Sequence, residues 1–539
     1  MEKFFIQFIS LIMIILGLVM LARRIKIAYP IVLVLGGLLL SFFDVFSSIT
    51  ISPDLIFFLF LPPLLYEAAW QTSWKEFWRF RRVILSFAFP IVFVTSLVVA
   101  LVAEAVIPGF GLALGFVLGG IVSPPDAISA SSIMRNVKVP KQLVSIAEGE
   151  SLLNDASSLV VFRFASIAVT TGNFVFRHAA IDFVLVIVLG VAIGLAVALV
   201  FYAIYRWLPT TTSIDIVLSF VAPYCMYYFA EHFKYSGVLA VVSGGLFLSS
   251  QRQKMLNHLS RAQGFNVWST VGFVLNGLVF LLIGLQMPTI TKQLGDIKFG
   301  SAIGYGLLIS LVLVVSRLLC TLGASLFTRF MSNFITVADA NPGWKAPLVL
   351  GWAGMRGVVS LAAALSIPVM MGDNQPFPQR NLILFITFIV ILVTLVFQGL
   401  TLPWVIRKLR LEERNGTFSE IKQETIIQKK LASVSLAFLD ENYTDDLINN
   451  EHLSNLKSSL TSKLKYFNED YEDQQAHADS DPLRQYLQVT LQLLDRQREL
   501  LDKMNHRSEF DEDLIRKYLA LIDLEEISLR KRIPEQVGR

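Results

Sequence analysis

Long apolar runs separated by short polar segments occupy the first three quarters of the chain. A helix needs about 20 apolar residues to cross a bilayer, and fewer where it is tilted or buried among other helices. The pattern therefore predicts about thirteen membrane spans. They cover 4–22, 27–43, 54–70, 83–103, 112–134, 143–171, 179–205, 213–231, 236–250, 266–286, 299–328, 346–371 and 381–404. We expect an all-α polytopic membrane protein whose two termini lie on opposite sides of the bilayer.

The first run, 4–22, is interpreted as a retained span, because it lacks a small-residue cleavage site and is followed by Arg23, Arg24 and Lys26. Basic residues then recur in alternate loops, about 19 on one side of the bilayer and about six on the other. Loops rich in Lys and Arg face the cytoplasm. The distribution predicts a cell-membrane protein with its N-terminus outside and its C-terminus in the cytoplasm.

Composition separates the chain into two parts of different character. The whole chain is 54% hydrophobic and 16% charged, with a mean hydropathy of +0.60. Residues 1–410 hold about 28 Lys and Arg against about 16 Asp and Glu, whereas residues 411–539 hold about 18 against about 26. We expect a transmembrane domain at 1–410 and an acidic, helical cytoplasmic tail at 411–539. No nucleic-acid-binding motif accompanies the basic part.

The tail carries its own helix signals. Asp481-Pro482 is a good helix start, because an acidic cap precedes a proline in the first turn. Leucines then recur every seven residues, and a second amphipathic stretch covers 511–533, while 468–481 is interpreted as a linker. The heptad leucines are Leu487, Leu494 and Leu501. A short coiled coil or helix pair is the predicted module, and regulation, dimerisation or binding of a cytosolic partner remain alternative roles for it.

Polar residues gather on one face of the sixth span, in the sequence Glu-Gly-Glu-Ser-Leu-Leu-Asn-Asp at 148–155. Helical spacing places Glu150 above Asn154, and Ser151 above Asp155. Two carboxylates, an amide and a hydroxyl thus share a face of a segment that otherwise belongs in hydrocarbon. An ionisable group inside a membrane span is costly and indicates a functional site.

Two other spans contain sequences that interrupt a helix. Pro124 and Pro125 precede Asp126 in the fifth span, and Arg356 lies within the glycine-rich sequence 351–357 of the twelfth. Paired interrupted helices in the two halves of a transporter mark its substrate site. Asp126 and Arg356 would compensate the dipoles of the half-helices. The alternative at Asp126 is a simple proline kink with the aspartate capping the next half-helix.

Further charged residues lie inside apolar runs, and a structural ion pair is the first interpretation for each. They are Glu67, Arg163 and Arg317. The remaining alternatives concern function. A channel would show a carbonyl filter or rings of charge, and neither is visible. An intramembrane enzyme would use Asp126 and Asp155 as acid and base. No phosphate-binding Gly-x-x-x-x-Gly-Lys motif, cofactor motif or metal-ligand spacing is present.

Several of these stretches together resemble the bacterial sodium–proton exchangers of the monovalent cation–proton antiporter-1 family. The matching pieces are Leu61-Pro62-Pro63 with Glu67, Ser123-Pro124-Pro125-Asp126, Glu150-Ser151-Leu152-Leu153-Asn154-Asp155, Arg317, and Gly354-Met355-Arg356-Gly357. The resemblance covers essentially all of residues 1–410.

The resemblance implies a homodimer of thirteen-span subunits with inverted repeats, each with a dimer domain and a six-helix core in which two broken helices cross. It further implies that Asp155 holds either the cation or a proton. Ser151 and backbone oxygens of the fifth span would complete the ion's shell, with Asp126 beside them and Asn154 orienting the crossing. Glu150 would pair with Arg317, or as a second choice with Arg356.

In the family pattern, Asn154-Asp155 implies electroneutral exchange of one cation for one proton. Many members carry threonine at the position of Pro125, so a side-chain ligand is missing here, and backbone carbonyls or water would replace it. The expected function is secondary antiport of Na⁺, or of Li⁺ or K⁺, against H⁺, without a cofactor and without enzymatic chemistry.

Overall fold

The structure is a computed structural model of the 539-residue chain. The residues that it describes are 2–43, 55–137, 139–172, 176–292, 294, 297–331, 333, 343–371, 375–411, 420–444, 450–468, 482–505 and 512–530. They form two compact units, Met1–Glu413 and Arg414–Arg539.

The first unit is built of helices, most of them long and apolar. Their bounds are α1 Glu2–Ile25, α2 Tyr29–Leu40, η1 Leu55–Phe60, α4 Leu61–Gln71, α5 Trp74–Ser86, η2 Phe87–Ile91, α6 Val92–Val106, α7 Leu112–Val122, α8 Ala127–Asn136, α9 Lys141–Thr171, α10 Phe176–Trp207, α11 Thr212–His232, α12 Gly237–Met255, α13 His258–Leu285, α14 Met287–Lys292, α15 Phe299–Met331, α16 Lys345–Trp352, α17 Val358–Leu365, α18 Arg380–Val393, η3 Thr394–Gln398 and α19 Gly399–Leu409. The elements η1, η2 and η3 are π-helical turns within longer helices.

The expected all-α membrane architecture is confirmed. Eight helices in the described part of the chain are long and apolar enough to cross a membrane, and α2 and α7 are shorter apolar helices. Each predicted apolar run falls on one helix or on two or three consecutive helical elements. The total of thirteen spans stays a prediction, because several of these helices are too short to meet a span's length on their own.

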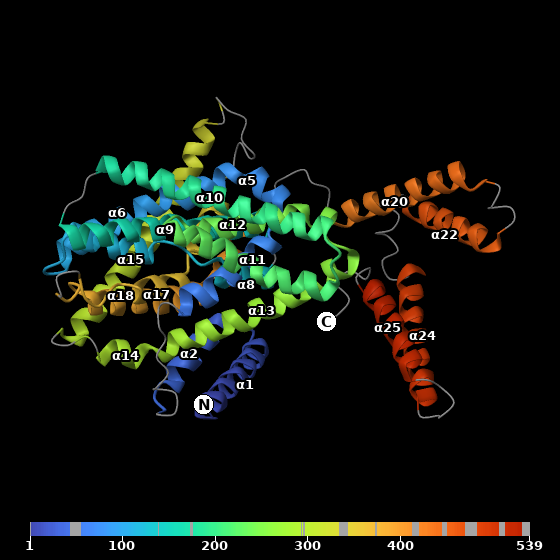
Figure 1. The fold of residues 1–539 in the computed structure, drawn as a ribbon, viewed down its shortest axis with the longest axis horizontal. Helices are drawn as coiled ribbons and strands as arrows, with labels where there is room; N and C mark the ends of the chain where they lie inside the picture. The colour runs from blue at the N-terminus through green and yellow to red at the C-terminus, as the bar shows by residue number, and fades with distance from the viewer. Residues whose placement is uncertain are drawn as a thin grey trace. The chain divides into compact units, whose positions relative to one another are not determined.

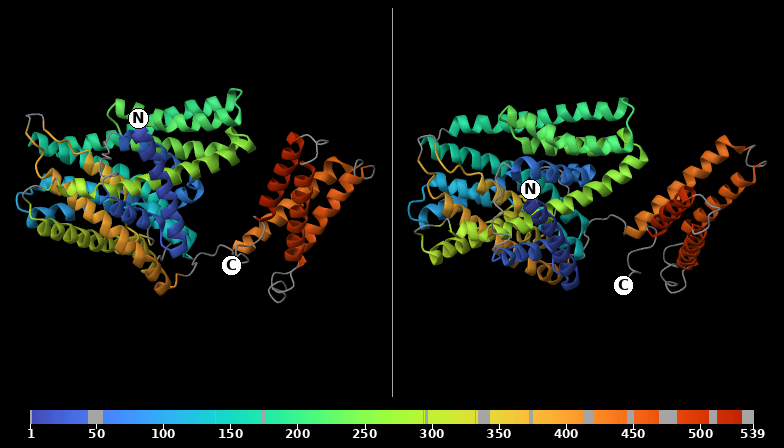
Figure 2. Two further views of the ribbon diagram at one scale, coloured as in Figure 1. Left: turned by 90° about the horizontal axis from the view of Figure 1, so that it is seen from below. Right: turned by 60° about the horizontal axis from the view of Figure 1, so that its bottom comes forward.

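The helices of this unit pack in two groups. Helices α10, α11 and α12 pack on one another, and α4 packs on α11, α12 and α13. Figures 1 and 2 show α10, α11 and α12 running side by side along one edge of the unit. We call α4, α10, α11, α12 and α13 the scaffold group. We call α6, α7, α9, α15, α16 and α18 the core group. In it, α7 packs on α6 and α9, and α15 packs on α16 and α18.

Glycines allow α2 and α13 to approach closely. A Cβ atom on Gly37 of α2 would lie 2.2 Å from the backbone oxygen of Leu281, and one on Gly284 of α13 would lie 2.2 Å from that of Val34. Small residues at such crossings let apolar helices gain packing contacts that lipid cannot supply. These two helices are therefore joined backbone to backbone.

Two spans of the core group are broken where the sequence predicts it. Helix α7 ends at Val122, two prolines follow, and α8 begins after Asp126. Helix α16 ends at Trp352, and α17 begins at Val358 after the glycine-containing segment 353–357. Proline cannot donate a backbone hydrogen bond and glycine weakens a helix, so both interruptions follow from local sequence.

The second unit consists of two helix pairs. Helix α20 (Glu420–Asn442) packs on α22 (Glu451–Asn468), and α24 (Pro482–Asn505) packs on α25 (Glu512–Arg530). The predicted helix start at Pro482 is confirmed. Leu494 is buried in the α24–α25 core and Leu501 packs against it. The side chain of Leu487, and residues 469–481 of the expected linker, lie outside the described residues.

Candidate functional site

The polar face of α9 is buried in the middle of the first unit. Glu150 is 2% exposed, Asn154 is 0% exposed and Asp155 is 8% exposed. The helix runs unbroken from Lys141 to Thr171, so the spacing predicted from the sequence is kept. Ser151, on the same helix, is half-buried. Helix α9 packs on both broken spans, on α7 and α8 of the fifth and on α16 and α17 of the twelfth.

Asp126 caps the second half of the broken fifth span. Its carboxylate accepts hydrogen bonds from the backbone N–H of Ile128 at 3.1 Å and of Ser129 at 3.4 Å. The Ser129 hydroxyl donates to the same carboxylate at 2.7 Å. An aspartate at the N-terminus of a helix satisfies donors that have no partner within the helix and interacts favourably with the helix dipole. Asp126 is thus a helix cap, as the alternative interpretation expects, and its place beside a bound cation stays a prediction.

The two broken spans meet through their backbones. The N–H of Asp126 donates to the backbone oxygen of Met355 at 2.6 Å. Gly357 lies against the aspartate, and a Cβ atom there would come within 2.6 Å of Asp126 Oδ2. A larger residue at position 357 would displace the carboxylate, so the crossing requires glycine at this point.

Arg356 is completely buried, and its donors are directed to the end of α7. Its Nε donates to the backbone oxygen of Val122 at 2.8 Å, and its Nη2 donates to that of Ser123 at 3.3 Å. Its Nη1 donates to the backbone oxygen of Gly354, and its own N–H donates to Thr394 Oγ1 at 3.1 Å. The guanidinium therefore compensates the negative end of a half-helix dipole.

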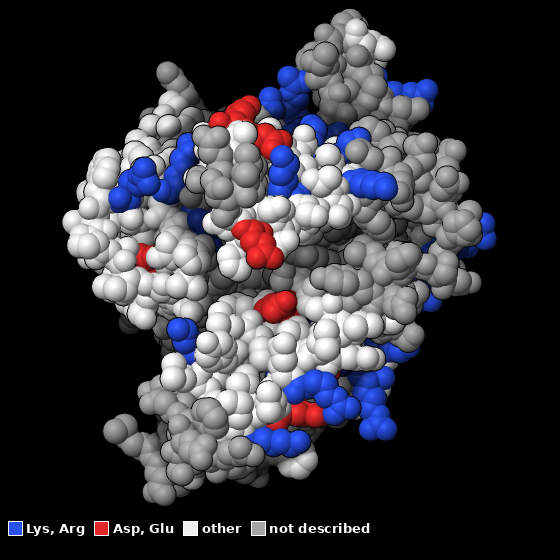
Figure 3. All heavy atoms as spheres, turned by 90° about the vertical axis from the view of Figure 1, so that its right-hand side faces the viewer, with Lys and Arg blue, Asp and Glu red and all other residues white. Residues whose placement is uncertain are grey.

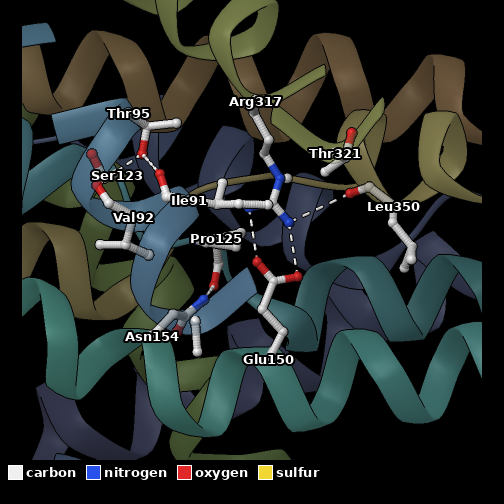
Figure 4. Close-up of polar contacts among 12 residues, drawn as sticks. Ile91, Val92, Thr95, Ser123, Pro125, Glu150, Asn154, Arg317, Thr321 and Leu350 are labelled. Atoms are coloured by element: carbon white, nitrogen blue, oxygen red, sulfur yellow. Dashed lines mark hydrogen bonds and ion pairs between the residues drawn. The ribbon is translucent and has the colours of Figure 1, made fainter. Parts of the chain in front are cut away.

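Glu150 pairs with Arg317 of α15 (Figure 4). Arg356, the second choice, forms no ion pair with Glu150. Nη1 of Arg317 lies 2.8 Å from Oε1 of Glu150, and Nη2 donates to Oε2 at 2.9 Å. Both side chains are nearly inaccessible, at 3% and 2% exposure. A two-point contact between a guanidinium and a carboxylate is the strongest common form of ion pair. It ties α9 to α15.

Asn154 joins α9 to the broken fifth span. Its Nδ2 donates to the backbone oxygen of Pro125 at 3.0 Å (Figure 4). Pro125 thus contributes a main-chain oxygen at the crossing, and a carbonyl oxygen has a second lone pair that this bond leaves unused. Pro125 lacks the hydroxyl of the threonine found in many family members, but its backbone oxygen is held in a fixed orientation at the same position.

Asp155 differs from its neighbours. Among the described residues, none forms an ion pair or a hydrogen bond with its carboxylate, although Asp126 is near enough to repel it electrostatically. A small pocket at the crossing is lined by Pro125, Asp126, Glu150 and Arg317 together with apolar residues, and Asp155 is not among its lining residues. A buried carboxylate without a partner requires a proton or a cation for neutralisation. The structure thus brings together the residues predicted from the sequence and leaves one carboxylate available.

The structural ion pairs expected for Glu67 and Arg163 are not found within the described part of the chain. Glu67 of α4 accepts a hydrogen bond from Gln71 Nε2 at 2.5 Å. Arg163 of α9 donates to the backbone oxygen of Lys234 at 3.1 Å. In both cases, a neutral group close in space takes the place of the expected opposite charge.

Two residues that contact the crossing are absent from the sequence-based prediction. Ser129 is three residues after the capping aspartate, a spacing typical of helix starts, so this signal was available. Thr394 lies 38 residues beyond Arg356, and only the packing of η3 on the broken twelfth span brings it there.

A family model described as sodium/hydrogen exchanger, transmembrane, matches residues 9–408. A relative from Bacillus pumilus, named a sodium, potassium, lithium and rubidium/H⁺ antiporter, is 33% identical over 78% of this chain and 63% of its own length. For the protein of that name from Bacillus subtilis the identity is also 33%, over 70% of this chain and 57% of the relative. This chain therefore aligns with less than two thirds of either Bacillus relative.

A relative from Aphanothece halophytica, a Na⁺/H⁺ antiporter, is 31% identical over 83% of both chains. The solved structure of a sodium proton antiporter from Methanocaldococcus jannaschii shares the fold, with a TM-score of 0.57 and 17% identity over 76% of this chain and all of the other. The broken spans, the polar face of α9 and the match over residues 9–408 lead to one conclusion. The chain belongs to the sodium/hydrogen exchanger family.

Proposed function

We propose that the protein exchanges a monovalent cation, Na⁺ in the first place, for H⁺ across the cell membrane. The observation that carries the proposal is the carboxylate of Asp155, which is 8% exposed and has no partner among the described residues, at the crossing of two broken spans. The printed names of relatives support the class of reaction, and those of the Bacillus relatives also include lithium and potassium.

Coupling follows from competition for one charge. Burying an uncompensated carboxylate is costly, so Asp155 is neutralised either by a proton or by a cation. The core can move across the membrane in either neutralised form, and movement with the bare charge is disfavoured. Asn154 is neutral and already bonded to Pro125. One carboxylate then carries one cation in one direction and one proton in the other, which makes the exchange electroneutral.

The cation would take oxygen ligands, as hard cations do. We assign Asp155 as the principal ligand, with Ser151 and the backbone oxygen of Pro125 as neutral ligands and Asp126 beside them. Glu150, Arg317 and Arg356 are assigned structural roles, because their charges are already matched by each other or by carbonyl groups. The chemistry requires no cofactor.

Basic residues support an orientation with the C-terminus in the cytoplasm. They occupy the last turns of α1, α8, α10, α12 and α19. Figure 3 shows that Lys and Arg side chains outnumber acidic ones on the end of the molecule that faces the viewer. We propose that this basic end faces the cytoplasm, that the subunit works as a homodimer in the cell membrane, and that the tail modulates exchange.

The test is cation-driven collapse of a preset pH gradient in proteoliposomes. Wild-type protein is expected to collapse the gradient with Na⁺, Li⁺ or K⁺, and Asp155→Asn is expected to fall to the rate of empty vesicles. Asp215→Asn is a matched control, since Asp215 is also a buried carboxylate but binds Ser260 Oγ at 2.6 Å in the scaffold group. Failure of all three cations with folded wild-type protein would overturn the proposal.

A further inference from the structure

A hydrogen bond crosses between the core group and the scaffold group, away from the crossing of the broken spans. Arg163 of α9 donates from Nη1 to the backbone oxygen of Lys234, in the turn between α11 and α12, at 3.1 Å. We propose that this contact is a latch that holds the two groups together on the side opposite the basic ends. Arg163 is thereby a positioning residue for exchange. The inference rests on the proposed alternating access.

The turn presents the Lys234 oxygen by its geometry. Helix α11 ends at His232, and Lys234 adopts a left-handed conformation with φ of 64°. The N–H of Lys234 donates to the Glu231 oxygen at 2.9 Å, and that of Tyr235 donates to the Ala230 oxygen, also at 2.9 Å. These bonds close the end of α11. The Lys234 oxygen is not used by these bonds and precedes the start of α12. It can therefore accept a hydrogen bond from a residue outside the turn.

The turn is also braced from within. Glu231 Oε1 accepts a hydrogen bond from the N–H of Gly237, the first residue of α12, at 3.0 Å. Ser236 caps α12 by accepting from the N–H of Leu239 at 3.2 Å. A Cβ atom on Gly237 would lie 2.7 Å from Tyr227 Cδ2 and 3.0 Å from Glu231 Cγ, so both side chains are packed tightly against the turn. The negative charge of Glu231 acts on Arg163 and favours a cation at that place.

Arg163 is mechanically connected to the site. It lies on the same unbroken helix as Asp155, eight residues further along, which is about 12 Å at 1.5 Å per residue. Any displacement of Asp155 with α9 relative to the scaffold therefore stretches the bond between Arg163 and Lys234. The bond must open when the core moves, and the free energy of that opening adds to the cost of leaving the present state.

The location of the latch indicates which side it closes. The Lys234 turn lies between the end of α11 and the start of α12, whereas the basic residues Arg252 and Lys254 lie in the last turn of α12. The latch is thus at the end of α12 opposite its basic end. Val160, one turn before Arg163 and on the same face of α9, is 4% exposed. Opening of the latch is expected to expose it to the outer solution.

The test measures access to Val160 directly. Val160→Cys is made in a chain whose Cys225 and Cys320 are replaced by serine, and its labelling by a membrane-impermeant maleimide is timed on intact cells. Thr171→Cys, at the exposed last residue of α9, reports maximal access. Adding Arg163→Gln is expected to raise the Val160→Cys labelling rate about three- to tenfold, the shift in a two-state equilibrium that loss of one solvent-exposed hydrogen bond produces. Arg163→Lys should give a smaller rise.

Arg206→Gln supplies a matched control. Arg206 of α10 donates from Nη1 to the backbone oxygen of Lys254 at 2.9 Å, the same type of bond between the same two residue types, but within the scaffold group. The Arg206→Gln variant should leave the labelling rate unchanged. An unchanged rate in Arg163→Gln, or an equal rise in both variants, would overturn the latch.

Exchange measured on the same variants separates the two proposals. Wild-type exchange together with unchanged labelling in Arg163→Gln removes the latch and leaves the antiport proposal intact. Absence of exchange in wild type removes the antiport proposal, while the labelling ratio still decides whether Arg163 holds this side closed.

Discussion

Consecutive turns of α9 hold carboxylates in opposite situations. Glu150 is met by both terminal nitrogens of Arg317, at 2.8 and 2.9 Å. Asp155 is also buried but has no cationic partner among the described residues. Burial therefore does not by itself distinguish a structural carboxylate from an exchangeable one. The distinction is whether the protein supplies a permanent counter-charge or leaves that place to an ion from solution.

The largest difference is expected between two variants that each remove the charge of one of these carboxylates. Glu150→Gln strands the buried guanidinium of Arg317 and should lower the free energy of unfolding by about 3–5 kcal/mol. Asp155→Asn removes a charge that has no partner and should leave thermal stability equal or higher, while abolishing exchange. Thermal unfolding in detergent, monitored by tryptophan fluorescence, measures both. Equal destabilisation by the two variants would end the comparison.

Asn154→Ala tests the connection between these two turns and the broken fifth span. The change removes the hydrogen bond to the Pro125 oxygen, a loss of about 1–3 kcal/mol for a buried group. We expect exchange to slow about tenfold, with apparent cation affinity also reduced because Pro125 is no longer oriented. Initial rates across a range of Na⁺ concentrations separate the two effects. A normal rate and affinity would show that Asn154 is not needed to orient the crossing.

Asn154→Asp sharpens the comparison from the other direction. It adds a second carboxylate next to Asp155, so two charges would need neutralisation for one cation. The exchange should then respond to membrane potential, measured by imposing a K⁺ diffusion potential with valinomycin. Wild type should be indifferent to the same potential, and a response of wild type would contradict the one-for-one proposal.

Ser129→Ala should have a smaller effect. The serine hydroxyl donates to Asp126 Oδ2 at 2.7 Å, whereas two backbone N–H groups still hold the carboxylate after the change. A shift of apparent cation affinity of about two- to fivefold is expected, without loss of folding. Ser132→Ala, one turn further along α8, is the matched control.

The smallest effect is expected in the tail, where carboxylates are exposed. Hydrogen bonds from Arg530 and Arg498 hold the pKa of the Glu526 carboxyl below its ordinary value of 4.5. Its folded-state pKa is lowered, so its stabilising contribution is complete above pH 4.5 and is lost as the pH falls further. Hydrogen-exchange protection factors in α24 and α25 of the full chain, which correct for the slower intrinsic exchange at acid pH, should be lower at about pH 4 than at pH 7. Glu526→Gln should reduce that difference.

Much of the architecture was predictable because the determinants are local. Apolar runs located the helices, and the prolines before Asp126 and the glycines around Arg356 located both breaks. The periodicity of α9 placed Glu150 and Asp155 on the buried face. The choice of Arg317 over Arg356 was not available from residue spacing, because it depends on where α15 packs against α9.

Contacts to backbone atoms were the least predictable. Arg163 finds the Lys234 oxygen 71 positions away, and Arg356 finds the Val122 oxygen 234 positions away. A carbonyl acceptor has no sequence signature, since every residue carries one. Charges in apolar runs therefore suggest ion pairs, although the folded chain satisfies several of them with main-chain oxygens.

The bond between the Asp126 N–H and the Met355 oxygen has a consequence for how such proteins vary. Both atoms belong to the main chain, so no substitution short of proline at position 126 removes the donor. The seam between the broken spans can persist while neighbouring side chains, including the one at position 125, are replaced over time. Substitutions near the site can therefore change the ion preference of homologous exchangers while the main-chain bond at the crossing is kept.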